Sequence, residues 1–138
     1  MKICKYGHKL TKGNVYIERM KRGKQCFIKR CLVCNRRRMN SFNANLKIEV
    51  LAHYGLNGKL QCCWPGCEVN DIDMLTLDHI NNDGAKHRRS ISIHRERNCG
   101  SIAYRNAKKQ GFPNIFQTLC WNHQCKKEML KRRENRMD

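Results

Sequence analysis

The sequence lacks long apolar runs and is poor in the residues that build a large core. Aromatic residues make up 7% of its 138 residues, and it has only 2 prolines. No stretch approaches the ~18 consecutive apolar residues of a membrane-spanning helix. The first residues, beginning Met1-Lys2-Ile3-Cys4, also lack the apolar run of a signal peptide. These absences predict a cytoplasmic protein with a modest core and no membrane partner.

Acidic residues are scarce as well. The 11 Asp and Glu residues against 29 Lys and Arg residues give a formal net charge of +18. A charge of this sign and size favours a polyanion partner, because each cation laid on a phosphate releases condensed counterions. Nucleic acid is therefore the expected partner.

The basic residues lie in several separate segments, as expected of contacts that follow a nucleic-acid backbone. Any one of these clusters taken alone could be a solvated surface, but together they predict a DNA-facing surface. The residues expected to contact DNA are Arg36, Arg37, Arg38, Arg88, Arg89, Lys126 and Lys127. Further basic residues of this kind are Arg95, Arg97, Lys131, Arg132 and Arg133, and a predicted hairpin tip at residues 21–24.

Ten cysteines offer a substitute for the missing core. Thiols stay reduced in the cytoplasm, which favours metal binding over disulfides. The first candidate zinc site combines Cys4-x3-His8 with Cys31-x2-Cys34, two ligand pairs on separate turns that together satisfy a tetrahedral ion. Cys26 competes as a ligand, but its offset from Cys31 suits a turn poorly, and it is expected to be a buried thiol.

The second candidate zinc site consists of Cys63, Cys67, Cys120 and His123. Cys62 and Cys125 are alternatives to Cys63 and His123. We favour Cys63 because the Trp-Pro-Gly turn brings two thiolates together at that spacing, and His123 because Cys-x2-His is a common metal-binding turn. Four protein ligands at each site predict structural zinc. Cys99 has no close partner and is expected to be a spare thiol.

The chain divides in the sequence into an N-terminal zinc module (1–34), a helical connector (35–56) and a second module (57–138). Beta-prone runs at 14–18 and 25–28 predict a hairpin in the first module. In the connector, apolar residues at helical spacing predict a face that packs against the second module; they are Met39, Phe42, Leu46, Val50 and Tyr54. The second module is expected to contain strands at 74–77 and 116–119, a helix over 101–110 capped by Ser101, and a basic helix over 123–136.

Asp78 and His79 follow directly on the first of these strands. Adjacent side chains at a strand's end point to opposite sides, so a carboxylate there can hold a divalent metal while the imidazole reaches a water molecule. Phosphodiester hydrolysis needs that division of labour. An Asp-His dipeptide alone is commonplace, but this one lies between the two halves of a zinc site.

Two segments carry a resemblance to a known family. They are Leu77-Asp78-His79-Ile80-Asn81-Asn82-Asp83-Gly84 with His87-Arg88, and Phe116-x2-Leu119-Cys120-Trp121-Asn122-His123. About residues 60–130 resemble the HNH endonucleases, specifically the small zinc-stapled members of phage type, and residues 4–34 resemble the finger that often precedes them. The resemblance implies a small α+β fold: a zinc-stapled ββα-metal (His-Me finger) core, preceded by a zinc-ribbon-like hairpin module and a connecting helix. The resemblance also implies that the protein is located in the cytoplasm of a bacterial cell or of a phage-infected host cell.

Carried over residue by residue, the resemblance implies that Asp78 binds a catalytic Mg²⁺ or Mn²⁺ ion and that His79 is the general base. The implied products carry 5′-phosphate and 3′-hydroxyl ends. Asn114 is the candidate for the family's middle position, which orients His79. The alternatives for that position are Asn81, Asn82 and Asn106.

Gln124 departs from the family pattern, because it stands where the family has His or Asn as second metal ligand. Its carbonyl lies one methylene further out, which implies loose metal binding or a bridging water. Alternatively, His123 turns to the catalytic metal and Cys125 closes the zinc site, or His87 lies near the metal or the scissile phosphate. Gln124 is the first choice.

The leading hypothesis is therefore a metal-dependent endonuclease or nickase acting on double-stranded DNA, with two structural zinc ions and one Mg²⁺ or Mn²⁺ ion. The alternative, favoured by Gln124, is a zinc-dependent nucleic-acid-binding protein with a degenerate nuclease site. A ribosome-associated zinc protein fits the charge and the cysteines but leaves Asp78 and His79 unexplained.

Overall fold

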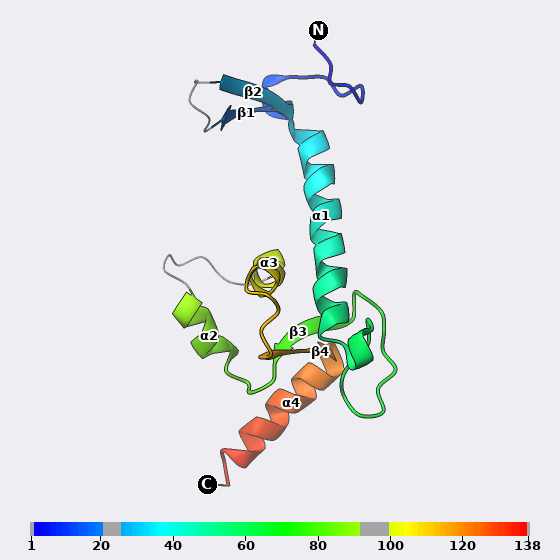
Figure 1. The fold of residues 1–138 in the computed structure, drawn as a ribbon, viewed down its shortest axis with the longest axis vertical. Coiled ribbons are helices and arrows are strands. Elements are labelled where there is room, and N and C mark those ends of the chain that lie inside the picture. Colours follow the sequence, from blue (N-terminus) through cyan, green and yellow to red (C-terminus); the bar gives the residue numbers. More distant parts are fainter. Residues whose placement is uncertain (1, 21–25, 92–99, 138) are drawn as a thin grey trace. The chain divides into compact units, whose positions relative to one another are not determined.

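The computed structural model describes residues 2–20, 26–91 and 100–137. These residues form a small α+β protein with two antiparallel two-stranded sheets and four α-helices (Figure 1). The chain divides into two compact units, Met1–Ala44 and Asn45–Asp138. The predicted hairpin tip at 21–24, together with Arg95, Arg97 and Cys99, lies outside the described residues, as do the side chains of Cys26 and Arg88.

The first unit is a hairpin with a short turn before it. A bridge between Ile3 and Lys9 closes the turn, and a 3₁₀ helix, η1 (Lys12–Asn14), leads into strand β1 (Val15–Met20). Strand β2 (Cys26–Cys31) pairs with β1 in antiparallel register, from Val15 opposite Cys31 to Met20 opposite Cys26. This pairing confirms the predicted hairpin.

Helix α1 (Leu32–His53) starts directly after β2 and is shared by the two units. Asn14 fastens its first turn, because its Oδ1 accepts a hydrogen bond from the Val33 amide at 3.1 Å. Of the predicted apolar face, Leu46, Val50 and Tyr54 are buried, whereas the Phe42 side chain is 52% exposed. The face is thus buried only from Leu46 onward, because the core that covers it belongs to the second unit.

The second unit is organised around a hairpin and the helix that follows it. After the 3₁₀ turn η2 (Leu56–Gly58), strand β3 (Leu75–His79) pairs antiparallel with β4 (Phe116–Cys120), so that Asp78 lies opposite Gln117 and His79 opposite Phe116. Helix α4 (Trp121–Glu134) begins immediately after β4 and contacts both strands. Both predicted strands and the basic C-terminal helix are confirmed, with ends shifted by a few residues.

The segment between β3 and β4 contains helices α2 (Gly84–Ile91) and α3 (Ser101–Lys109). Helix α2 was not predicted, because its basic run, residues 86–89, contains no apolar residue. Ser101 does not cap α3 as expected. The N-cap position belongs to Gly100, whose φ of 54° suits glycine, and the side chain of Ser101 lies one residue too late to accept from the first turn.

The core of the second unit consists of two small clusters. One joins α1, α3 and β4 through Leu46, Val50, Tyr54, Ala107 and Phe116. The other includes Leu51, Cys62, Leu75, Leu119 and Cys120. Cys62 and Cys120 of the second cluster also belong to a candidate metal site, so the hydrophobic core and that site have these two residues in common. No helix within the described ranges is long and apolar enough to span a bilayer.

Candidate zinc centres and candidate active site

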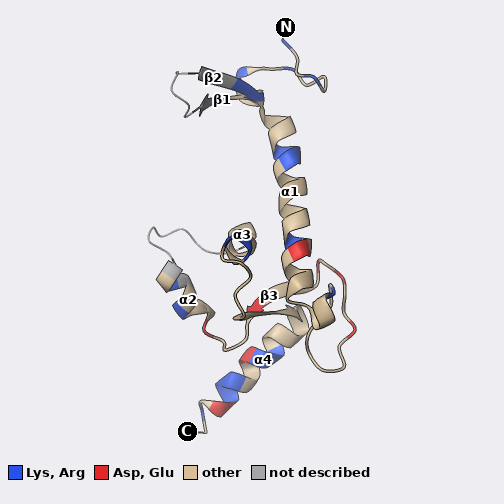
Figure 2. Ribbon diagram, viewed as in Figure 1, with Lys and Arg blue, Asp and Glu red and all other residues tan. Residues whose placement is uncertain are grey.

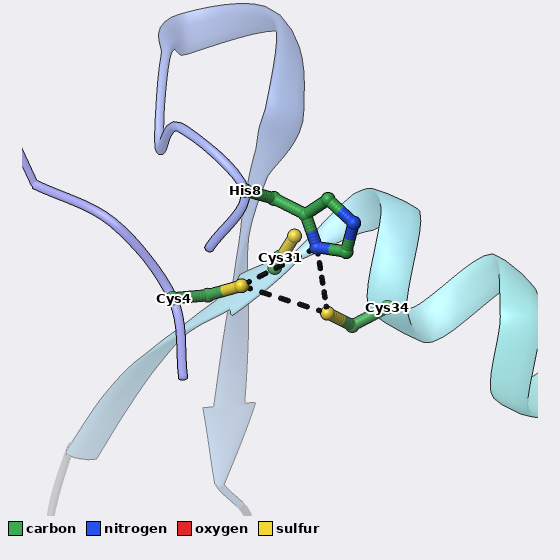
Figure 3. A group of neighbouring side chains, drawn as sticks. All are labelled: Cys4, His8, Cys31 and Cys34. Carbon is green, nitrogen blue, oxygen red and sulfur yellow. Dashed lines mark hydrogen bonds between the residues drawn. The ribbon is translucent and has the colours of Figure 1, made fainter. Parts of the chain in front are cut away.

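The structure brings Cys4, His8, Cys31 and Cys34 together, as the sequence predicts (Figure 3). Cys4 and His8 come from the N-terminal turn, Cys31 ends β2, and Cys34 lies in the first turn of α1. The Cys4 Sγ atom lies 3.4 Å from His8 Nδ1 and 3.6 Å from Cys34 Sγ. A tetrahedral zinc ion separates its sulfur and nitrogen ligands by about 3.5 to 3.8 Å, so the group could hold zinc.

The pKa values of two thiols in this cluster are shifted in opposite directions. A hydrogen bond from the Cys34 backbone lowers the pKa of the Cys31 thiol. Desolvation raises the pKa of the Cys34 thiol to about 11. Zinc binds thiolates, so binding must displace the proton of Cys34, and the affinity for zinc is expected to fall as the pH falls.

A second group of ligand atoms consists of Cys62, Cys67, Cys120 and His123, and it could also hold zinc. Cys120 Sγ lies 3.1 Å from His123 Nδ1 and 4.0 Å from Cys67 Sγ, and Cys62 Sγ lies 3.7 Å from His123 Nδ1. The backbone amide of Cys120 also donates to Cys62 Sγ at 3.2 Å. These contacts join the loop before β3 to the start of α4.

Cys62, and not Cys63, belongs to this second group. The Cys63 thiol instead donates to the Tyr54 carbonyl at the end of α1, at 3.1 Å. Neighbouring residues of an extended segment point to opposite sides, so only one of the two can face the other ligands. Cys125 lies exposed on α4, outside the group, and His123 remains within it.

The two adjacent cysteines provide a matched pair of variants. We expect Cys62→Ser to lose the zinc of the second cluster, lowering the metal content from about two atoms per chain to about one, because a hydroxyl replaces a thiolate ligand. Cys63→Ser is expected to keep both ions, because that side chain only donates to a carbonyl. Elemental analysis of the purified variants measures this. Equal zinc content in the two variants would contradict the assignment.

Asp78 is buried near the end of β3 and is held by two donors. Lys127 Nζ lies 2.5 Å from Asp78 Oδ2, and Gln117 Nε2 donates to the same oxygen at 2.9 Å. Lys127 also reaches the His79 carbonyl at 2.5 Å. The ammonium group of Lys127 on α4 therefore binds both the Asp78 carboxylate and the backbone carbonyl of His79 at the end of β3.

The imidazole of His79 contacts residues of α2 and β4. Its Nε2 is 2.9 Å from Nδ1 of His87, and its ring centre is 4.7 Å from that of Phe116. Gly84 closes the other side, because a Cβ atom there would lie 2.8 Å from His79 Nδ1. His87, Phe116 and Gly84 therefore restrict the ring.

Asp78 and His79 line a cavity of about 860 Å³, and residues of α4 line it as well. Asp78 and His79 line it from β3, and Gln124, Glu128 and Lys131 line it from α4. Gln124 Oε1 accepts a hydrogen bond from Thr76 Oγ1 at 3.0 Å, so this carbonyl is oriented by β3. The predicted Asp78, His79 and Gln124 thus share one cavity.

Two other predicted site residues lie elsewhere. Asn114 is exposed and does not line the cavity among the described residues, whereas Asn82, one of its alternatives, does. His87 is also absent from the described lining residues; its Nδ1 faces His79. His87 is therefore placed beside the imidazole of His79.

Three features of this site were not predicted from the sequence: the contact of Lys127 with Asp78, the position of Glu128, and the close approach of Gly84 to His79. Residues three or four apart on a helix share a face. The spacing of Lys127 and Glu128 from Gln124 was thus an available signal. Nothing in the sequence indicated that Gly84 leaves room for the His79 ring, because this contact depends on how the start of α2 packs against the end of β3.

The remaining basic residues are mostly exposed. Arg36, Arg37 and Arg38 lie exposed on α1, and Arg89 on α2. Lys126 lies on α4, where its ammonium is 5.4 Å from the ring centre of Trp64, and that ring in turn stacks on His123. Figure 2 shows Lys and Arg residues on α4 interspersed with acidic residues. Lys127 differs from the rest, because its side chain is only 16% exposed and pairs with Asp78.

Comparisons with protein-family models, curated proteins and solved structures found no match.

Proposed function

We propose that the protein is a metal-dependent endonuclease or nickase that hydrolyses double-stranded DNA to 5′-phosphate and 3′-hydroxyl ends. In this proposal β3, β4 and α4 form a ββα-metal core of the HNH type. The observation that carries it is the shared cavity: a carboxylate and an imidazole at the end of β3 face the same space as Gln124 on α4.

The residues of the cavity suit a hard divalent ion. Both donors to Asp78 contact Oδ2, so we assign Oδ1 to the metal. Mg²⁺ prefers oxygen ligands and keeps several waters, so one carboxylate with a nearby amide carbonyl is an adequate protein contribution. When bound, Mg²⁺ or Mn²⁺ would stabilise the negative charge that develops on the phosphate.

His79 is the proposed general base. It lies next to Asp78 in the chain and lines the same cavity, so its ring can take a proton from a water that attacks the phosphate. Phe116 and Gly84 restrict the ring, which lowers the cost of orienting it for the reaction. Lys127 fixes the carbonyl of His79 and so the end of the strand.

The exposed arginines and lysines would hold the duplex through its phosphates. Such contacts give affinity without reading bases, and they weaken steeply as salt is raised. Zinc has a structural part in this proposal, because its four ligands leave no position for a substrate.

A second candidate function is binding of nucleic acid without cleavage. The ammonium of Lys127 on Asp78 Oδ2 favours it, because a fixed cation there competes electrostatically with a divalent ion. Gln124 favours it too, since its carbonyl is already used by Thr76.

Incubation with supercoiled plasmid distinguishes the two functions. We expect the zinc-loaded protein to nick or linearise the plasmid in Mg²⁺ or Mn²⁺, and His79→Ala to lower the rate by about 10²- to 10⁴-fold, since it lacks the general base. Gel electrophoresis of the plasmid forms measures the rate. Equal cleavage by both proteins would sink the nuclease proposal, and tight, salt-sensitive binding without cleavage would support the second candidate.

A further inference from the structure

We propose that a cationic cleft beside the first candidate zinc cluster binds the phosphodiester backbone of double-stranded DNA. The inference rests on the proposed DNA substrate but not on cleavage. The cleft belongs to the first unit, Met1–Ala44, and none of its described lining residues also lines the cavity at Asp78. The proposal thus assigns to the first unit a site that holds the duplex.

The positive charge of the protein is concentrated in this first unit. Residues 1–44 contain 13 of the 29 Lys and Arg residues but only 1 of the 11 acidic residues, Glu18. They therefore contribute +12 to the formal net charge of +18, although they are less than a third of the 138 residues. A polyanion is attracted more strongly, residue for residue, to the first unit than to the rest of the chain.

Two adjoining cavities of about 500 and 260 Å³ form the cationic cleft. Tyr6, Cys34 and Arg38 line both cavities, so the two spaces meet along these residues. The cations of the cleft come from the N-terminal turn, the end of β2 and α1, and none of the described lining residues is acidic. Figure 2 shows the end of β2 in blue, where it passes into α1. The cations are Lys5, Lys29, Arg30, Arg37 and Arg38.

Two of these cations are held in place at the cleft. Lys5 Nζ lies 4.8 Å from the ring centre of Tyr6, and Arg38 Nη2 donates to Asn35 Oδ1 at 3.0 Å. Each contact restricts a long side chain, while an ammonium or guanidinium group has further N–H donors for a ligand. Partly fixed donors lower the entropy that is lost when phosphates bind.

The zinc cluster alone does not account for so many cations. Cys4, Cys31 and Cys34 line the same cleft, and as three thiolates they exceed the charge of a zinc ion by one. One cation therefore balances the cluster, and the other cations of the cleft repel each other. Cations from three segments, spread over two adjoining cavities, suit a row of phosphates better than one small anion.

A matched pair of double variants tests the inference. Lys5→Gln/Lys29→Gln removes two cations from the cleft. Lys9→Gln/Lys12→Gln removes two exposed lysines of the same unit that are not among the described lining residues. Both variants lose the same charge, and each changes one residue that directly follows a ligand of the first cluster. A difference between them therefore reports the position of the charge and not its amount.

Binding is measured with the full-length, zinc-loaded protein by fluorescence anisotropy of a labelled duplex, over a range of KCl concentrations and without Mg²⁺ or Mn²⁺. Each phosphate contact adds about 0.9 to the slope of log affinity against log salt. We expect Lys5→Gln/Lys29→Gln to lower the magnitude of this slope by about 2, and to weaken binding at about 0.1 M salt by about 10- to 100-fold. Lys9→Gln/Lys12→Gln is expected to keep the wild-type slope and to weaken binding by less than about 3-fold, because salt screens charges that touch no phosphate.

Zinc content and thermal unfolding show that each variant is folded. Arg38→Gln is a second cleft variant for the case that Lys5→Gln disturbs the first cluster, because Arg38 lies one helical turn beyond the nearest ligand, Cys34. This single change is expected to lower the magnitude of the slope by about 1.

The outcomes separate failure of this inference from failure of the proposed function. An equal loss of slope in the two double variants would overturn the inference, because the first unit would then act through its total charge alone. A wild-type slope in the folded cleft variants would overturn it as well. Loss of slope in the cleft variants alone, in a protein that does not cut plasmid in Mg²⁺ or Mn²⁺, would support the DNA site and overturn the nuclease function.

Discussion

Removal of zinc from the second cluster is expected to unfold the unit formed by residues 45–138. Structural zinc supplies about 10 to 16 kcal/mol of apparent binding free energy in small zinc-binding domains, whereas a whole domain is stable by about 5 to 15 kcal/mol. The small core of this unit includes two of the ligands, Cys62 and Cys120, so the metal and the packing are lost together. Circular dichroism during titration with a chelator measures the loss, and added zinc should reverse it.

In the metal-free cluster the Cys62 thiol is expected to remain protonated at neutral pH. Burial raises the pKa of the Cys62 thiol to about 11, so zinc must displace its proton, and chelation should become easier as the pH is lowered. Cys125→Ser is the matched control, because Cys125 is an exposed thiol outside the cluster. A chelator-treated protein that keeps its circular dichroism and its cooperative unfolding would contradict a structural role for zinc.

A Gly84→Ala variant is expected to lose cleavage activity while keeping its stability. The added Cβ atom would lie 2.8 Å from His79 Nδ1, so the imidazole must move. A shift of about 1 Å in a reacting group costs about 100-fold in rate. Gly84 is the first residue of α2, where alanine is the better helix former, so the free energy of unfolding should stay the same or rise by up to about 1 kcal/mol.

Gly13→Ala is the matched control for this variant. A Cβ atom at Gly13 meets no neighbour within 4 Å, and this glycine lies in the first unit, outside the cavity. Plasmid cleavage and thermal unfolding are measured for both proteins. A Gly84→Ala protein that cuts as fast as the wild type, or one that loses its fold along with its activity, would refute the idea that this glycine makes room for the base.

Most elements of the fold were predictable from local patterns. The hairpin of β1 and β2, the long apolar-faced α1 and the pair β3 and β4 follow from alternation, helical spacing and glycine positions. Helix α2 could not be found in this way, because it is short and its residues are mostly basic or polar. Its position depends on contacts of His87 with His79 at the end of β3 and with Phe116 of β4, and β4 is distant in sequence.

The ligands of the first candidate zinc cluster were all predictable, because each of its two ligand pairs has a short spacing within one local segment. The second was not, since Cys62 and Cys63 have the same local surroundings. Only the position of the Tyr54 carbonyl, which takes the Cys63 thiol, decides between them. Similarly, the resemblance marked Asp78 and His79, but their pairing with Lys127 and His87 requires α4 and α2 to be in place.

The sequence by itself determined the charge, the two sets of metal-binding residue types and the adjacent carboxylate and imidazole, because these depend on composition and on spacings within one turn or strand. The tertiary structure decided which cysteine faces the second cluster, which cation covers Asp78 and which side chain faces Nε2 of His79. Each of these depends on a contact between residues that chain folding alone brings together, so no local pattern records it.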